Sequence, residues 1–269
     1  MSNSSSKSGV LIDKKEEDQS YTVYVNKTQS FEHETERWIY YKVCHKFDPK
    51  IVIDVGCYIG DWTRLFTSIF PEANVLMLDA NIDHAEKLQK MCDNNPRIQY
   101  EITGVGNGIT DIGSHDFYVL KKDNKDLVTT GSSFLKENTV YYTNDTMYET
   151  RKIPCFGLDD ILDKYFPGGH VIDYLKIDVQ GYEPQVLRGA KYTLQRTRLL
   201  QVEVNVIEYN QGSIKFHEII QMLYRDYKFV MIDQIGAMYM PKSGMMAQMD
   251  LLFAHENDPD FILRPPFDN

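Results

Sequence analysis

The sequence predicts an α/β fold built on a doubly wound, mostly parallel sheet with helices on both faces. Short apolar runs, typical of buried strands, alternate along the chain with amphipathic helical runs. Strands joined by a crossover helix lie parallel. The last two apolar runs are separated only by a stretch rich in Met and Gly, so we expect them to pair antiparallel at one edge.

The predicted strands are runs of Val, Ile, Leu and aromatic residues that stop at glycine or polar residues; they are residues 50–54, 74–79, 98–103, 171–178, 199–205, 229–233 and 251–255. The predicted helices carry an apolar stripe; they are residues 31–47, 61–69, 83–94, 158–166, 184–195 and 213–227. Pro71 and Pro96 end the second and third of these helices. Residues 21–26, 116–120 and 151–156 are expected to be extended.

Composition narrows the classes of partner. The chain has 29 Lys and Arg against 39 Asp and Glu among 269 residues, for a formal net charge of −10. This balance argues against nucleic-acid and membrane partners, and no apolar run approaches the roughly 20 residues of a membrane span. The four cysteines form no CxxC pair, which predicts neither zinc nor a disulfide framework and favours a reducing, cytoplasmic compartment.

The domain organisation is predicted to be simple. Residues 1–20 are rich in Ser and charged residues and are expected to be a disordered tail. Residues 21–269 are expected to form a single domain, in which 107–156 is an irregular insertion.

The strongest candidate site follows the first strand of the alternating series, where residues 54–61 read DVGCYIGD and open a helix. Gly56 and Gly60 let the backbone approach a ligand closely, because a Cβ would obstruct it. The spacing differs from the G-x-G-x-x-G of a pyrophosphate loop, and Asp54 precedes it. An acid there suits a positively charged ligand without phosphate, such as S-adenosylmethionine; a tight turn without a ligand is the alternative.

Asp79 ends the second strand, 23 residues after Gly56. An acid about 20 residues beyond a glycine turn is where the ribose hydroxyls of a bound nucleoside are accepted. A solvated strand end is the alternative for Asp79 alone. Residues 104–106, GVG, end the third strand and would leave room for an adenine ring, although a plain turn explains them equally well. Order and spacing together predict a nucleoside cofactor.

Charged residues interrupt an otherwise apolar strand at Lys176 and Asp178. Strand alternation puts both on one face, with Asp178 at the carboxyl end, where open α/β sheets bind ligands. The next strand carries Glu203 and Asn205 in the same way. Asp178, Glu203 and Asn205 are predicted to face one crevice, as a base with its orienting groups or as ligands of one divalent cation. A structural pair of Lys176 with an acid is the alternative.

Four runs together resemble the FkbM family of S-adenosylmethionine-dependent methyltransferases: VIDVGCYIGDWT (52–63), TTGSSF (129–134), FGLDDIL (156–162) and KIDVQGYEPQVLRGA (176–190). The resemblance spans about residues 50–205. It implies a Rossmann-like class I methyltransferase fold, a seven-stranded sheet with an antiparallel last strand. It also implies methyl transfer to a hydroxyl of a sugar, polyketide or other glycoside-like small molecule, so the expected partner is a small-molecule or glycan acceptor.

The residue pattern and the resemblance together assign three sets of site residues. The cofactor set is Asp54, Gly56, Tyr58, Gly60, Asp61, Asp79, Ala80, Asn81, Gly104, Val105 and Gly106. The catalytic set is Lys176, Asp178 and Glu203, and the acceptor set is Ser132, Ser133, Gln180, Glu183 and Asn205. A divalent cation, if the enzyme uses one, would bind Asp178, Glu203 and Asn205.

Gln180 departs from the family pattern, which commonly has Glu at this position. The general base is then expected to be Asp178 first and Glu203 second, with Lys176 keeping a carboxylate ionised. Tyrosines at 141, 142 and 148 would cap the acceptor pocket. Two alternatives stay open: N-methylation of peptide side-chain amides, and a non-catalytic binding module, which the change at Gln180 favours.

Overall fold

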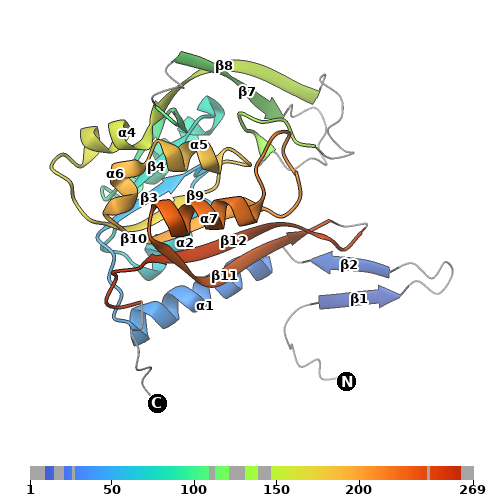
Figure 1. The fold of residues 1–269 in the computed structure, drawn as a ribbon, viewed down its shortest axis with the longest axis horizontal. Helices are drawn as coiled ribbons and strands as arrows, with labels where there is room; N and C mark the ends of the chain where they lie inside the picture. The colour runs from blue at the N-terminus through green and yellow to red at the C-terminus, as the bar shows by residue number, and fades with distance from the viewer. Residues whose placement is uncertain are drawn as a thin grey trace.

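The computed structural model describes residues 10–14, 21–25, 28–108, 113–120, 131–138, 147–240 and 243–261 of the chain. Figure 1 shows a central twisted sheet with helices packed against it and a smaller sheet beyond one edge of the strands. No helix within these ranges is long and apolar enough to cross a lipid bilayer.

The central sheet has seven strands in the order β11-β12-β10-β9-β3-β4-β5. Their bounds are β3 Ile51–Val55, β4 Asn74–Asp79, β5 Ile98–Ile102, β9 Ile172–Ile177, β10 Thr197–Asn205, β11 Phe229–Tyr239 and β12 Met246–His255. The strands from β10 to β5 pair in parallel, whereas β12 runs antiparallel to both β10 and β11. This order confirms the predicted mostly parallel sheet and its antiparallel last strand.

Two layers of helices cover the sheet. One face packs against α1 (Thr28–Cys44), α2 (Asp61–Ile69) and α3 (Ala85–Asn94). The other face packs against α4 (Leu158–Tyr165), α5 (Glu183–Arg188), α6 (Lys191–Gln195) and α7 (Phe216–Asp226). The predicted helix over 184–195 is therefore two helices, and the break comes at Gly189, whose Cβ would lie 1.8 Å from the carbonyl oxygen of Gly106.

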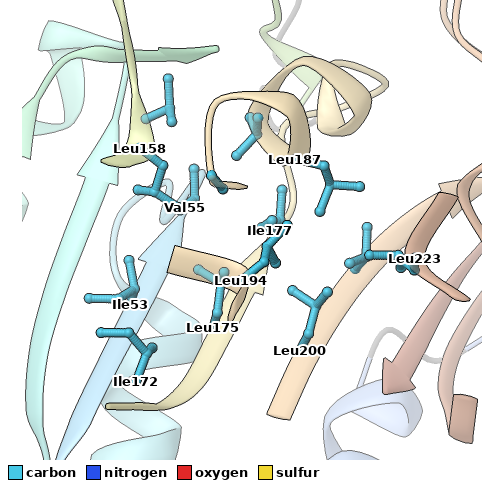
Figure 2. Close-up of a cluster of buried hydrophobic side chains, with 14 of the residues drawn as sticks. Ile53, Val55, Leu158, Ile172, Leu175, Ile177, Leu187, Leu194, Leu200 and Leu223 are labelled. Atoms are coloured by element: carbon cyan, nitrogen blue, oxygen red, sulfur yellow. The ribbon is translucent and has the colours of Figure 1, made fainter. Parts of the chain in front are cut away.

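Strand alternation divides the side chains between these layers. Ile53, Val55 and Leu175 point into the cluster drawn in Figure 2, which Leu187 and Leu223 join from the helices. Each such side chain contributes about 1.5–3 kcal/mol when it is fully buried. The residues between them on β3 and β9 point to the opposite face, and there the strands carry Asp54 and Lys176 among apolar neighbours. That face holds the polar groups of the site.

A second sheet has three strands in the order β6-β8-β7, with β6 Gly104–Gly106, β7 Gly113–Leu120 and β8 Tyr148–Gly157. The segment 104–106 is thus a separate strand rather than the end of β5 as predicted, because the chain leaves the central sheet at Thr103 and pairs with β8. Residues 118 and 133 form an isolated bridge, which ties the described part of the 107–156 segment together.

Residues at the start of the chain also form a pair of strands. β1 (Val10–Lys14) pairs antiparallel with β2 (Tyr21–Val25), which agrees with the predicted extended run at 21–26. Part of the segment that we predicted to be a disordered tail is therefore a strand, because the backbone of residues 10–14 pairs with that of residues 21–25. The rest of residues 1–20 lies outside the described residues.

Candidate active site

A cavity of about 620 Å³ lies at the carboxyl ends of β3, β4, β9 and β10. The predicted site residues that line it are Gly56, Tyr58, Asp61, Asp79, Ala80, Asn81, Val105, Ser132, Lys176, Asp178, Gln180 and Glu203. The predicted residues that do not line it are Asp54, Gly60, Gly104, Gly106, Ser133, Glu183 and Asn205. The fold thus gathers residues from six separate stretches of the sequence, between positions 56 and 203, into one hollow, and the remaining residues lie outside it.

The turn after β3 needs glycine for a reason that the sequence did not indicate. Gly56 has a φ of +81°, and a Cβ there would lie 1.8 Å from the carbonyl oxygen of Asp178. Gly56 therefore lets the loops after β3 and β9 touch, in addition to lining the cavity. Gly60 has a φ of +82° and precedes α2, where a Cβ would meet the sulfur of Met91 at 2.7 Å. These glycines shape the turn.

Asp54 stands behind the cavity wall. It is fully buried, and its Oδ2 accepts a hydrogen bond of 2.6 Å from the hydroxyl of Thr63 on α2. Lys176 Nζ is 3.9 Å from its Oδ1. Burial raises the pKa of Asp54, and Lys176 and Thr63 oppose that shift. Its position indicates that Asp54 joins β3 to α2 and to Lys176 rather than touching a ligand.

The loop end of the cavity is formed by Tyr58, Asp79, Asn81, Thr103 and Val105. Asp79 is its central acid: Oδ2 accepts from the backbone N–H of Tyr58 at 2.8 Å, and Oδ1 accepts from the backbone N–H of Asn81 at 2.7 Å. His84 Nδ1 lies 3.0 Å from the same Oδ1. Three contacts fix this carboxylate where it lines the cavity.

Four side chains at the middle of the cavity form one polar chain. Lys176 Nζ donates to Asp178 Oδ2 at 2.9 Å, and Gln180 Nε2 donates to Asp178 Oδ1 at 2.9 Å. Gln180 Nε2 also donates to Glu203 Oε2 at 3.0 Å. Gln248 on β12 donates to that same oxygen at 2.9 Å. Glu203 Oε1 has no hydrogen-bond partner among the described residues.

Electrostatics set this group apart from ordinary surface acids. Burial raises the pKa of Glu203 well above its usual range, and the charges of Asp178 and Asp250 raise it further. Burial lowers the pKa of Lys176, but Asp178 and Asp54 outweigh that effect and raise it overall. Lys176 is therefore a permanent cation, and it pairs with Asp178.

Three predicted acceptor residues lie outside the cavity. Ser133 Oγ donates to the carbonyl oxygens of Val179 and Gln180, each at 3.0 Å. Glu183 Oε1 accepts from the backbone N–H groups of Val179 and Gly181 at 2.9 and 3.1 Å. Both hold the loop after β9. Asn205 is buried near the end of β10, and its Oδ1 has no hydrogen-bond partner in the described structure.

The position of Asn205 also bears on the divalent-cation site that was predicted for the case that the enzyme uses a metal ion. Asn205 does not line the cavity with Asp178 and Glu203, and within the described ranges no three His, Cys, Asp or Glu side chains are arranged to hold a metal ion.

The inner end of the cavity consists of residues that the sequence analysis missed: Glu34, Trp62, Gln201, Ile235 and Asp250. Trp62 Nε1 donates to Glu34 Oε1 at 2.8 Å, and the nearby Gln201 side chain lowers the pKa of both Glu34 and Asp250. Burial raises the pKa of Glu34 to about 8 and that of Asp250 to about 6, each aided by a neighbouring carboxylate. Of these residues, only Gln201 could have been found from the sequence, because strand alternation puts it on the same face as Leu199 and Glu203.

The sheet order and the position of the cavity define the class of protein: a doubly wound α/β protein with a cavity at the carboxyl ends of its strands, where open sheets of this kind bind ligands. The sequence of residues 54–231 matches the Methyltransferase FkbM domain. This match covers more than half of the chain, and the protein belongs to the FkbM methyltransferase family. It is a methyltransferase that uses S-adenosylmethionine, so the alternative of a non-catalytic binding module was wrong.

Individual relatives are more distant. Over 188 residues the chain is 27% identical to the 2-O-methyltransferase NoeI of Sinorhizobium fredii, and the aligned region covers 66% of this chain and 72% of that protein. Among solved structures, cofactor-bound Rv0187 from MTB aligns with a TM-score of 0.47 and 12% identity over 87% of this chain and 83% of its own. M. capricolum TrmK in complex with S-adenosylhomocysteine aligns with a TM-score of 0.41 and 9% identity over 82% and 67%.

The chemistry of the cavity wall fits this cofactor. Lys176 is the only Lys or Arg among the lining residues that the structure describes, and Asp178 pairs with it, so this part of the wall offers no free cation to a phosphate. Carboxylates instead predominate, at Asp61, Asp79, Asp178 and Glu203. A sulfonium with an ammonium group and no phosphate suits such a wall.

Proposed function

We propose that this methyltransferase acts on a hydroxyl oxygen of a sugar or glycosylated small molecule. The observation that carries the proposal is the carboxylate of Glu203, which faces the cavity beside Asp178 with one oxygen unengaged by the described residues. A sugar hydroxyl is a poor nucleophile at neutral pH and needs such a base. The name of the relative NoeI, a 2-O-methyltransferase, also supports oxygen as the acceptor atom.

The loop end is proposed to hold the cofactor. Asp79 would accept the ribose hydroxyls, while Tyr58, Asn81 and Val105 would surround the adenosine. Bound S-adenosylmethionine supplies an activated methyl group, so the chain itself must align the acceptor and receive its proton. Asp178 at the end of β9 and Glu203 on β10 would flank the acceptor hydroxyl.

Glu203 is a better base than Asp178 on this geometry, which reverses the order expected from sequence. Both oxygens of Asp178 already accept a hydrogen bond, one from Lys176 and one from Gln180. Glu203 Oε1 accepts no hydrogen bond from the described residues, and burial raises the pKa of this carboxyl, which makes it a stronger base when it is ionised. In the proposed step the hydroxyl proton passes to Glu203 Oε1 as the oxygen takes the methyl group.

The lining of the cavity also suits a carbohydrate. Trp62, Phe117 and Phe134 present aromatic surface to the cavity, and Gln201 and Ser132 offer polar groups. Sugars bind where aromatic faces and hydrogen-bonding side chains occur together. Of the three tyrosines predicted to cap this pocket, those at 141 and 142 lie outside the described residues, and Tyr148 is buried in β8. The cytoplasmic location also stays a prediction.

Labelled S-adenosylmethionine and a panel of methylatable sugars and glycosides test the proposal, with and without EDTA. Glu203→Gln should lower kcat by about 10²–10⁴-fold, the range for a lost general base, while the affinity for S-adenosylhomocysteine stays within about twofold. Asp178→Asn should cost less, about tenfold, because it removes an orienting partner. Near-normal turnover of Glu203→Gln, or methylation only of nitrogen acceptors, would rule out this assignment.

A further inference from the structure

Gln180 lies between two carboxylates that belong to neighbouring strands. Its Nε2 is 2.9 Å from Asp178 Oδ1 and 3.0 Å from Glu203 Oε2, so each of its two hydrogens has an acceptor. We propose that Gln180 is a positioning residue whose amide lets the two negative charges lie side by side and turns Glu203 Oε1 toward the acceptor. This inference rests on the proposed role of Glu203 as the base.

The nitrogen, rather than the oxygen, of the amide must face the carboxylates, since carboxylate oxygens only accept hydrogen bonds when ionised. If no donor lay between them, two carboxylates that can both reach one amide group would share a proton, and one of them would no longer act as a base. The charge of Asp178 is already among the causes that raise the pKa of Glu203. A neutral donor that reaches both groups limits this repulsion without adding a competing cation.

The backbone around Gln180 is built to hold this position. Gln180 has a φ of +55°, in the left-handed region that residues other than glycine rarely adopt. Ser133 donates its hydroxyl to the carbonyl oxygens of Val179 and Gln180, and Glu183 accepts from the N–H groups on either side of Gln180. The buried Ser133 and Glu183 therefore act on the loop, and through it on Gln180.

Gln248 supplies a matched control. Its Nε2 donates to the same Glu203 Oε2 at 2.9 Å, from β12. It does not line the cavity and makes no hydrogen bond to Asp178 in the described structure. Loss of either glutamine removes one hydrogen bond from Glu203, but only loss of Gln180 removes the link to Asp178.

The test compares Gln180→Met with Gln248→Met, each in the wild-type and the Asp178→Asn background. Carboxyl ¹³C NMR of Glu-labelled protein with S-adenosylhomocysteine follows the titration of Glu203, which Glu203→Gln identifies. Gln180→Met should raise the pKa of Glu203 in the wild-type background and raise it much less beside Asn at 178. Gln248→Met should raise it equally in both backgrounds.

Turnover gives the second readout. Gln180→Met should lower kcat about 10–100-fold near neutral pH and displace the acid limb of the pH profile upward, so that activity recovers as the pH rises. A residue that only supports the fold would lower kcat equally at every pH. Gln180→Glu, which keeps the shape but has at most one hydrogen to donate, should displace the limb further and serves if Gln180→Met does not fold.

An unchanged Glu203 titration in Gln180→Met, or equal effects of Gln180→Met in both backgrounds, would overturn the inference. A kcat that falls without any change in the pH profile would also overturn it. If the wild-type enzyme methylates no hydroxyl acceptor, the proposed function fails, but the NMR titration still decides whether Gln180 bridges the two carboxylates.

Discussion

The two ends of the cavity are built in different ways. The loop end consists of short segments directly after β3, β4 and β5, and its central acid, Asp79, is fixed mostly by backbone N–H groups within a few residues of a strand end. The inner end draws Glu34 from α1, Trp62 from α2, Gln201 from β10 and Asp250 from β12. Packing of α1 and α2 on the sheet brings these distant elements together, and the hydrogen bond from Trp62 to Glu34 joins two of them.

This difference shows how the chain separates two tasks. A local loop at the end of a strand places a ligand with little dependence on the rest of the fold. The inner carboxylates depend on the docking of α1, and each carries a burial penalty that Gln201 and Trp62 only partly offset. We therefore expect the loop end to govern cofactor affinity, and the inner end to govern the acceptor and the pH dependence of stability.

The largest expected effect falls on the loop end. Gly56→Ala should lower the free energy of unfolding by about 3–6 kcal/mol, since its Cβ would lie 1.8 Å from the carbonyl oxygen of Asp178 at a φ of +81°. Chemical denaturation measures this change. Gly212→Ala is the matched control, because Gly212 has a φ of +78° but no atom within 4 Å of its Cβ, and it should cost about 1 kcal/mol. Equal costs would show that space at Gly56 is not limiting.

The inner end should affect how the free energy of unfolding depends on pH. The folded-state pKa of Glu34 is about 8, above its ordinary value of 4.5, so the unfolded chain ionises first as the pH rises. The free energy of unfolding of the wild type should therefore fall as the pH rises from 4.5 to about 8, and Glu34→Gln should not show this fall. The variant should gain on the order of 2–4 kcal/mol relative to wild type between pH 5 and 8. Glu86→Gln, at a fully exposed site, should run parallel to wild type.

If the free energy of unfolding of Glu34→Gln changes with pH as that of the wild type does, Glu34 is not held in a desolvated site, and the contrast between the two ends of the cavity does not hold.

A smaller effect is expected on cofactor affinity. Asp79→Asn should weaken S-adenosylhomocysteine binding about 10–100-fold, because an acceptor of ribose hydroxyls loses its charge. Calorimetric titration measures this directly. Asp83→Asn is the control. Asp83 forms an ion pair with Arg151 but does not line the cavity, so this variant should bind S-adenosylhomocysteine as tightly as the wild type does. If both variants bind as wild type does, Asp79 does not hold the ribose.

The same contrast explains which parts of the site the sequence predicts. The loop end was predicted by residue spacing, because Gly56 and Asp79 lie at fixed offsets from strands that hydrophobic patterns identify. Asp178, Glu203 and Asn205 were also predicted to face one crevice, because polar side chains on a buried strand stand out. Asp178 and Glu203 do line one cavity, together with Lys176, but Asn205 does not.

The inner end was missed for the opposite reason. Glu34 lies in a helix with many other polar residues, and only the docking of α1 on the sheet makes it a buried group. Asp250 belongs to the long hairpin of β11 and β12, where pattern reading placed the strand five residues too late. Asn205 shows the converse error: strand alternation put it on the right face, but it lies beyond the reach of the cavity.

A crystal structure of the enzyme with S-adenosylhomocysteine would show which end of the cavity holds the nucleoside. We expect the ribose hydroxyls to contact Asp79, and the sulfur to lie toward Asp178 and Glu203, with the inner end left open for the acceptor. A complex in which the nucleoside occupies the inner end, against Glu34 and Asp250, or in which the sulfur faces away from Glu203, would contradict this expectation.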